Sequence, residues 1–239
     1  MLSWSEEVAS ATFWDTSGVA YSDPDLGVSG WPAFSDDGGH VAFGRYGKWV
    51  ALFTTSGDRI WEIEARSIQS LAVADGGGRV AVARRAQRDT RVLMLNEAGQ
   101  LLWDIMLDSY RVHGVSFSPS GDKLAVLEYT ESGYAVSVLS AETGSQQSRC
   151  ALGEPSGAGY RGYSFLAVDE NGSAVTAIPT PDDAGIVVRI YTLSSRGTLL
   201  ATHTVRFGAG TIVSELNWQV WGDMLGVSAG RAYHVVPMK

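Results

Sequence analysis

The stretch Phe117–Val126 reads FSPSGDKLAV, and four other segments of the chain repeat its pattern. Each copy has an apolar residue, a small or polar residue, a turn cluster with Gly in the fifth position, and a second apolar run. A Gly-containing turn supplies the positive φ that a tight connection between two β runs needs, so each copy predicts a β-hairpin. The other copies are FSDDGGHVAF at Phe34–Phe43, VADGGGRVAV at Val73–Val82, VDENGSAVTA at Val168–Ala177 and WQVWGDMLGV at Trp218–Val227.

A second Gly turn follows each of the first four copies and leads into another strand-like run. These turns open the segments SGDRIWEI at Ser56–Ile63, AGQLLWDI at Ala98–Ile105, TGSQQSRC at Thr143–Cys150 and RGTLLATH at Arg196–His203. Each unit is therefore two hairpins, or four short strands, in about 40–50 residues, which is the length of one propeller blade. No stretch of helical length has 3.6-residue periodicity.

The repeats predict an all-β fold, a single β-propeller domain over residues 1–239, with five four-stranded blades in residues 31–239. The fifth repeat ends after the run Ala232–Pro237, without a fourth strand. The N-terminal Leu2–Glu6 resembles Leu101–Ile105, so we expect residues 1–8 to be the closing strand that completes the last blade. This closure removes two unpaired sheet edges. Residues 9–30 form an insertion or, as the alternative, a degenerate sixth blade, and we favour the insertion.

The motifs resemble those of known propeller families. FSPSGDKLAV is similar to the hairpin motif of WD40-like and TolB-type repeats, and AGQLLWDI to the repeat of quinoprotein-like propellers such as the BamB-type outer-membrane assembly proteins. The resemblance covers roughly residues 31–239. It implies the propeller architecture and carries over no catalytic residue, because the Gly-His start of true WD40 repeats and the consecutive quinone-binding motifs are absent.

The composition of the chain disfavours some classes of binding partner. The chain has 18 basic and 26 acidic residues and a formal net charge of −8, which disfavours nucleic acid and anionic membranes. There is no secretory signal and no long apolar run, so we expect a cytoplasmic protein with no membrane partner. The single cysteine, Cys150, excludes an intramolecular disulfide and is expected to pack as a small apolar residue.

A candidate binding face follows from the strand order. The loops between blades and the loops from second to third strand share one side of a propeller, and here they carry many arginines and tyrosines. Arg offers a planar fork of donors for carboxylates or phosphates, and Tyr adds rigid contact area. The plain alternative is solvated arginines and packed tyrosines, with His113 packed inside. The predicted site residues are Arg45, Tyr46, Arg66, Tyr110, Arg111, His113, Tyr160, Arg161 and Tyr163.

The predicted function is a non-catalytic platform that binds a protein or peptide on this face, with acidic groups preferred. No catalytic, nucleotide-binding or metal-binding motif is present, and we expect no cofactor and no metal. The alternatives are a lectin-like propeller that binds a small molecule or glycan, and a hydrolase or lyase. The last would use the loop-face carboxylates Asp108, Glu128, Glu131, Glu154, Asp182 and Asp183. The protein would act as a monomer or as a subunit of a larger assembly.

Overall fold

The computed structural model describes residues 2–5, 10–14, 20–23, 32–45, 49–86, 89–153, 164–208, 211, 216–221, 223–229 and 232–237. For residues 2–5, 10–14 and 20–23, and for Arg45 and Trp221, it describes the backbone alone. Within these ranges the chain is almost entirely β-structure, with one short 3-10 turn at Asp75–Gly77. The all-β prediction is confirmed.

Six antiparallel sheets make up the described part of the chain, and in each of them the strands follow one another in chain order. The four-stranded sheets are β4–β7 (Ala33–Phe34, His40–Arg45, Trp49–Thr54, Arg59–Glu64), β8–β11 (Ile68–Val73, Arg79–Ala86, Asp89–Asn96, Leu101–Leu107), β12–β15 (Arg111–Phe117, Lys123–Thr130, Gly133–Ser140, Gln146–Gly153) and β16–β19 (Phe165–Val168, Ala174–Asp182, Gly185–Leu193, Leu199–Phe207). The three-stranded sheets are β1–β3 (Leu2–Ser5, Ser10–Trp14, Ala20–Asp23) and β20–β22 (Leu216–Trp221, Met224–Ala229, Ala232–Pro237).

The predicted hairpin turns lie where the repeat places them. In the four-stranded sheets, the first Gly of each repeat joins the first and second strands and the second Gly joins the third and fourth. Each of these glycines has positive φ, which L side chains rarely adopt, so the sequence signal has a direct conformational cause. The φ values are 70° at Gly38, 67° at Gly77, 74° at Gly121, 89° at Gly172, 99° at Gly57, 74° at Gly99, 72° at Gly144 and 74° at Gly197.

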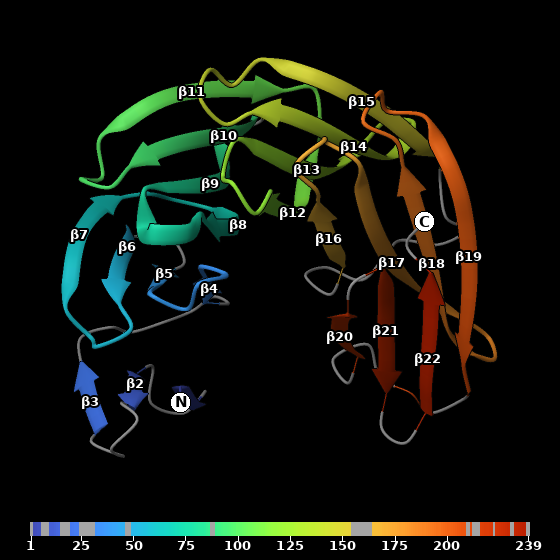
Figure 1. Cartoon of the computed structure of the whole chain (residues 1–239), viewed down its shortest axis with the longest axis horizontal. Helices are drawn as coiled ribbons and strands as arrows, with labels where there is room; N and C mark the ends of the chain where they lie inside the picture. The colour runs from blue at the N-terminus through green and yellow to red at the C-terminus, as the bar shows by residue number, and fades with distance from the viewer. Residues whose placement is uncertain are drawn as a thin grey trace.

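The middle strands of the sheets are buried on both faces. Seven of the eight residues of β14 are buried, whereas the outer strand β15 alternates between buried and exposed residues. A strand that is apolar on both faces needs a neighbouring sheet on each side. Figure 1 shows how this need is met: the sheets stand side by side around an arc, with first strands such as β8, β12 and β16 innermost and fourth strands such as β11, β15 and β19 outermost.

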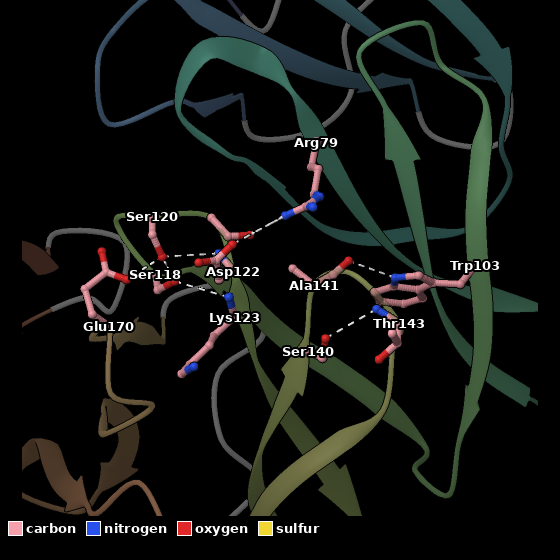
Figure 2. A network of polar contacts seen from close by, with 11 residues as sticks. Arg79, Trp103, Ser118, Ser120, Asp122, Lys123, Ser140, Ala141, Thr143 and Glu170 are labelled. Atoms are coloured by element: carbon pink, nitrogen blue, oxygen red, sulfur yellow. Dashed lines mark hydrogen bonds and ion pairs between the residues drawn. The ribbon is translucent and has the colours of Figure 1, made fainter.

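A tryptophan on the outer strand of one sheet packs on the second Gly turn of the next sheet. A Cβ added at Gly99 would lie 2.9 Å from Cγ of Trp61, and one added at Gly144 would lie 3.0 Å from Trp103. Nε1 of Trp103 also donates a 2.9 Å hydrogen bond to the carbonyl of Ala141 (Figure 2). Glycine therefore permits the positive φ of these turns and leaves room for the indole ring.

The indole of Trp61 lacks the corresponding hydrogen bond. Gly144 is four residues beyond Ser140, whose carbonyl accepts its amide, whereas Gly99 is three residues beyond the equivalent Asn96. The turn of Gly99 is therefore one residue shorter, and Nε1 of Trp61 is buried without a partner among the described residues.

On the opposite side from the loops between sheets, successive first-hairpin turns are hydrogen-bonded to one another. The amide of Asp37 donates to Asp75 at 2.9 Å, and the amide of Gly76 donates back to Asp37 at 2.8 Å. The hydroxyl of Ser35 and the amides of Gly39 and Gly76 lower the pKa of Asp37 to about 2. We call this side, with both sets of Gly turns, the turn side.

The same kind of link continues around the turn side, as Figure 2 shows. Arg79 donates to the carbonyl of Gly121 at 3.1 Å, which joins the second four-stranded sheet to the third. The hydroxyl of Ser120 donates to Glu170, which joins the third sheet to the fourth. Each turn is thus fixed both by its own backbone and by the next turn.

The N-terminal strand differs from the prediction. Leu2–Ser5 pairs antiparallel with Ser10–Trp14, which pairs in turn with Ala20–Asp23, and no described strand adds to β22 as a fourth strand. Ser10–Trp14 and Ala20–Asp23 thus form a three-stranded sheet with Leu2–Ser5, and the choice between an insertion and a degenerate sixth blade for residues 9–30 stays a prediction. Pairing between strands so close in sequence costs less chain entropy than pairing between the two ends of the chain. The number of blades and the closure of a ring stay predictions.

The Trp103 contact predicts that Gly144→Ala is more destabilising than an ordinary Gly→Ala change at positive φ. We expect a loss of about 2–4 kcal/mol in the free energy of unfolding, from the strained φ and the collision with the indole. The control is Gly153→Ala, because Gly153 has φ of 75° and open space around its Cβ position. It should cost about 1–2 kcal/mol, from φ alone. Urea unfolding measures both, and equal losses would contradict the contact.

Candidate functional site

A cleft of about 800 Å³ opens on the loop side, between the sheets β8–β11 and β12–β15. Asp89 lies at the start of β10, Asp108–Tyr110 connect β11 to β12, and Thr130–Ser132 connect β13 to β14. Met106 on β11 and Arg149 on β15 complete the wall. The cleft therefore gathers the loop between two sheets and the loops from second to third strand, the two kinds that the sequence analysis assigned to one side.

Tyr110 is the predicted site residue that lies in this cleft. Its side chain is 56% exposed, while its backbone amide donates a 2.8 Å hydrogen bond to the carbonyl of Tyr129 and so fixes the loop. Near it, Met106 is 64% exposed. A fixed tyrosine and an adaptable methionine together offer apolar contact area at the mouth of a polar cleft.

Arg111 and His113 follow Tyr110 in sequence but belong to other surroundings. Arg111 stands opposite Tyr129 in the strand pairing and lies near Tyr134, where its charge acts to lower the tyrosine pKa. His113 lies at a β-bulge, and its ring packs edge-on against Tyr134 at 5.1 Å and Tyr129 at 6.3 Å. The three predicted residues are thus divided between the cleft and an aromatic cluster.

Tyr134 forms the centre of that aromatic cluster. It is 2% exposed, and its ring also lies 5.1 Å from that of Tyr129. Burial first, and then the neighbouring Tyr129, raises the pKa of Tyr134 to about 12. The phenol of Tyr134 therefore stays neutral over the physiological range, and the cluster acts as packing beneath the loops.

A buried carboxyl group lies near the cleft and corrects one prediction, because Glu128 was expected among the exposed loop-face carboxylates. Glu128 on β13 is 2% exposed; it accepts a short hydrogen bond from Ser137 on β14, and Nε of Arg149 on β15 lies 3.7 Å away. Burial raises the pKa of Glu128, and the negative charge of Asp108 adds to this, although Ser137 and Arg149 oppose it. The three side chains form one polar row across three strands.

Several arginines outside the cleft are engaged in ion pairs. Arg66 pairs with Glu64 at 2.8 Å, and Arg91 pairs with Asp104 at 2.8 Å. By contrast, Asp108 and Glu131 in the cleft form no ion pair and accept no hydrogen bond from any residue in the described ranges. Ser109 also lines the cleft, and its buried hydroxyl has no partner there. The groups of the cleft without a partner among the described residues are therefore two solvent-exposed carboxylates and one buried hydroxyl.

Four of the predicted residues, Tyr46, Tyr160, Arg161 and Tyr163, lie outside the described residues. Arg45 ends strand β5 and is described by its backbone alone. Arg66 lies in the loop between β7 and β8, with its side chain 74% exposed. The second Tyr-Arg pair of the sequence prediction thus stays a prediction.

The burial of Glu128 has a faint signal in the sequence. Glu128 stands in the run KLAVLEYT, where five consecutive residues from Leu124 to Glu128 are buried. A single charged residue within an apolar strand is a sign of a buried polar contact. Its partners Ser137 and Arg149 lie on two other strands, so only the pairing register brings the three together.

No protein-family model matches the chain, and no curated protein matches it. Among solved structures, the chain is similar to hydrazine synthase from Kuenenia stuttgartiensis, with a TM-score of 0.65 and 14% identity over 96% of this chain and 71% of that one. It is also similar to the β-propeller domain of Cps50 (Swd1) from Myceliophteria thermophila, with a TM-score of 0.61 and 14% identity over 97% and 78% of the chains.

The chain has a WD40-like β-propeller fold. The four-stranded sheets are its blades, and the cleft around Tyr110 lies between the second and third of them. Identity at this level shows the fold alone. None of the described helical segments is long and apolar enough to cross a membrane, and within the described ranges no three His, Cys, Asp or Glu side chains converge as metal ligands would.

The raised pKa of Glu128 predicts a pH dependence of stability. The folded chain binds the proton of the Glu128 carboxyl group more tightly than the unfolded chain does. This group therefore lowers the free energy of unfolding as the pH rises above 4.5, the ordinary pKa of a glutamate side chain. We expect the unfolding free energy of Glu128→Gln minus that of the wild type to increase with pH over this range. Thermal or urea unfolding at several pH values measures it.

The control for this experiment is Glu142→Gln, at an exposed position in the turn between β14 and β15. Its difference from the wild type should stay flat with pH. A flat difference for Glu128→Gln as well would show that the buried carboxyl group does not titrate above its ordinary range.

Proposed function

We propose that this propeller is a non-catalytic platform that binds a protein or peptide segment in the loop-side cleft. The observation that carries the proposal is the pairing of an exposed Tyr110 with unpaired carboxylates in one cleft of about 800 Å³. Exposed aromatic residues beside polar groups that lack a protein partner favour the binding of another chain. Such a chain can contact the aromatic ring and form hydrogen bonds or ion pairs with the polar groups at the same time.

The charge of the cleft favours a basic group in the partner. Asp89, Asp108 and Glu131 line the cleft, and its one Arg, Arg149, is directed to Glu128. A Lys or Arg side chain of the partner would place its charge among the carboxylates and its stem along Met106 and Tyr110. This differs from the acidic partner expected from sequence, because the charged residues that line the cleft are mainly acidic.

The fold supports this proposal in general terms. A propeller holds its loops on a rigid stack of blades, which limits the entropy lost when a partner binds. The proposal includes no catalytic step, and a screen of ester, glycoside and phosphate substrates with the wild-type protein tests that part. Turnover that disappears in an Asp108→Asn variant would favour the hydrolase alternative.

The test of binding is affinity capture with the full chain in wild-type and charge-reversed forms. The cleft variant is Asp108→Lys with Glu131→Lys. The matched control is Glu97→Lys with Glu142→Lys, which makes the same change of charge on the turn side, at two exposed turn residues. Proteins bound by the wild type and the control, but lost from the cleft variant by at least tenfold, are the expected result.

A Tyr110→Ala variant tests the contribution of the aromatic side chain to partner binding separately from that of the carboxylates. It should weaken capture of the same partners without changing the net charge, and peptides tiled across a captured partner should bind best where Lys or Arg occurs. Equal recovery of every protein by all variants, or preference for acidic peptides, would contradict the proposal.

A further inference from the structure

We propose that the turn side carries a second binding site, a pocket that takes a peptide segment with a large apolar side chain next to Lys or Arg. It goes beyond the proposed function because it lies on the opposite side of the blades from the Tyr110 cleft. The site would give the propeller two independent contacts, one on each side.

The pocket has a volume of about 700 Å³ and lies at the turn-side ends of the inner strands. Phe117 of β12, Phe165 and Leu166 of β16, Leu200 of β19 and Val220 of β20 give it an apolar wall. A volume of this size with mostly apolar lining and a few polar groups is typical of a binding pocket.

Apolar side chains around this pocket are exposed to solvent. Leu200 is 63% exposed and Val220 is 47% exposed. A smaller cavity of about 230 Å³ shares Phe117 with the pocket and is lined by Phe34, which is 46% exposed. Apolar side chains that gather at a cavity, rather than scatter singly, indicate a surface that a partner covers.

A buried hydroxyl in the pocket lacks a hydrogen-bond partner. Thr192 of β18 lines the pocket and is 5% exposed, and its Oγ1 has no partner within the described part of the chain. A buried hydroxyl without a partner costs free energy. A peptide carries an amide or carbonyl at every residue, so it can complete this bond while its side chain fills the apolar wall.

The charges on the pocket are acidic. Asp36, Asp169 and Asp223 come from the turns of three different sheets and all line the pocket. Burial, and then Asp75 and Asp37, raise the pKa of Asp36, so negative charges surround this carboxyl group. A Lys or Arg beside the apolar residue of the partner would lie close to Asp36 and to the Asp37 and Asp75 charges that act on it, which favours a basic occupant.

The turns around the pocket are held in place. Pro119 lines it, and the adjacent Ser118 and Ser120 hydroxyls lie 3.3 Å apart in the network of Figure 2. Ser120 also donates to Glu170, next to Asp169. Links between neighbouring turns keep the wall of the pocket in one geometry, which lowers the entropy cost of binding.

The test uses three labelled tetrapeptides and fluorescence anisotropy with the full chain. The peptides are Lys-Leu-Phe-Lys, Glu-Leu-Phe-Glu and Lys-Ser-Ser-Lys, each capped at both ends. We expect the first to bind at least tenfold more tightly than either of the others, because only it combines apolar and basic groups. No measurable binding at millimolar protein, or equal binding of all three, would overturn the proposal.

Variants then place the bound peptide. Leu200→Asp should weaken binding of Lys-Leu-Phe-Lys at least tenfold. The matched control is Leu102→Asp, because Leu102 is also three residues after the second Gly of its repeat, is 47% exposed and does not line the pocket. Equal effects of the two variants would overturn the assignment.

Thr192→Val separates binding from folding. It removes a hydroxyl that has no partner within the described part of the chain, so the midpoint of urea unfolding should stay unchanged or rise. The peptide should bind severalfold more weakly, because it loses the hydrogen bond to this hydroxyl. Unchanged binding would overturn the role of Thr192. Because the cleft also favours basic groups, the same peptide is measured with the cleft variant Asp108→Lys with Glu131→Lys. Binding that the cleft variant keeps and Leu200→Asp loses assigns the peptide to the pocket, and binding that only the cleft variant loses would overturn the assignment.

Discussion

The structure depends on one constraint: the middle strands of the four-stranded sheets are largely apolar on both faces. A sheet of this kind has no face to turn to water, and only its outer strand alternates, as β15 shows beside β14. Successive sheets must therefore cover one another, which brings the tryptophan of one sheet onto the Gly turn of the next. The connections between strands therefore lie on the loop side and on the turn side. The cleft around Tyr110 is on the loop side and the pocket around Thr192 is on the turn side.

Sequence alone predicts what is encoded within one repeat. The positive-φ glycines Gly121 and Gly144 mark both hairpins of a blade because few other residues adopt that conformation. The N-terminal strand was assigned from its likeness to Leu101–Ile105, yet Leu2–Ser5 pairs with its sequence neighbour. Residue likeness reports that a segment is a strand, but pairing depends on chain entropy and geometry that no local pattern contains.

The candidate sites show the same limit more strongly. The sequence indicates which loops share one side, and Tyr110 lies in the cleft as its loop suggests. It does not indicate which charged side chains are paired or buried. Arg66 looks available in sequence and is paired with Glu64 in space, while the buried Glu128 looked like one surface carboxylate among several. Whether a charge is free depends on which strands lie beside it, and that information comes only with the register. Thr192, one residue in a β-rich run, gave no sequence signal.

The packing of Trp103 on Gly144 involves two neighbouring sheets and nothing beyond them. A contact of this kind repeats without regard to how many copies precede or follow it. Duplication or loss of a whole repeat during evolution would preserve every such contact and change only the angle that each sheet must span. Each repeat thus carries its own contacts to its neighbours, and these contacts are compatible with different numbers of repeats. The local pattern makes the fold easy to recognise, but a single repeat contains no information about the number of blades.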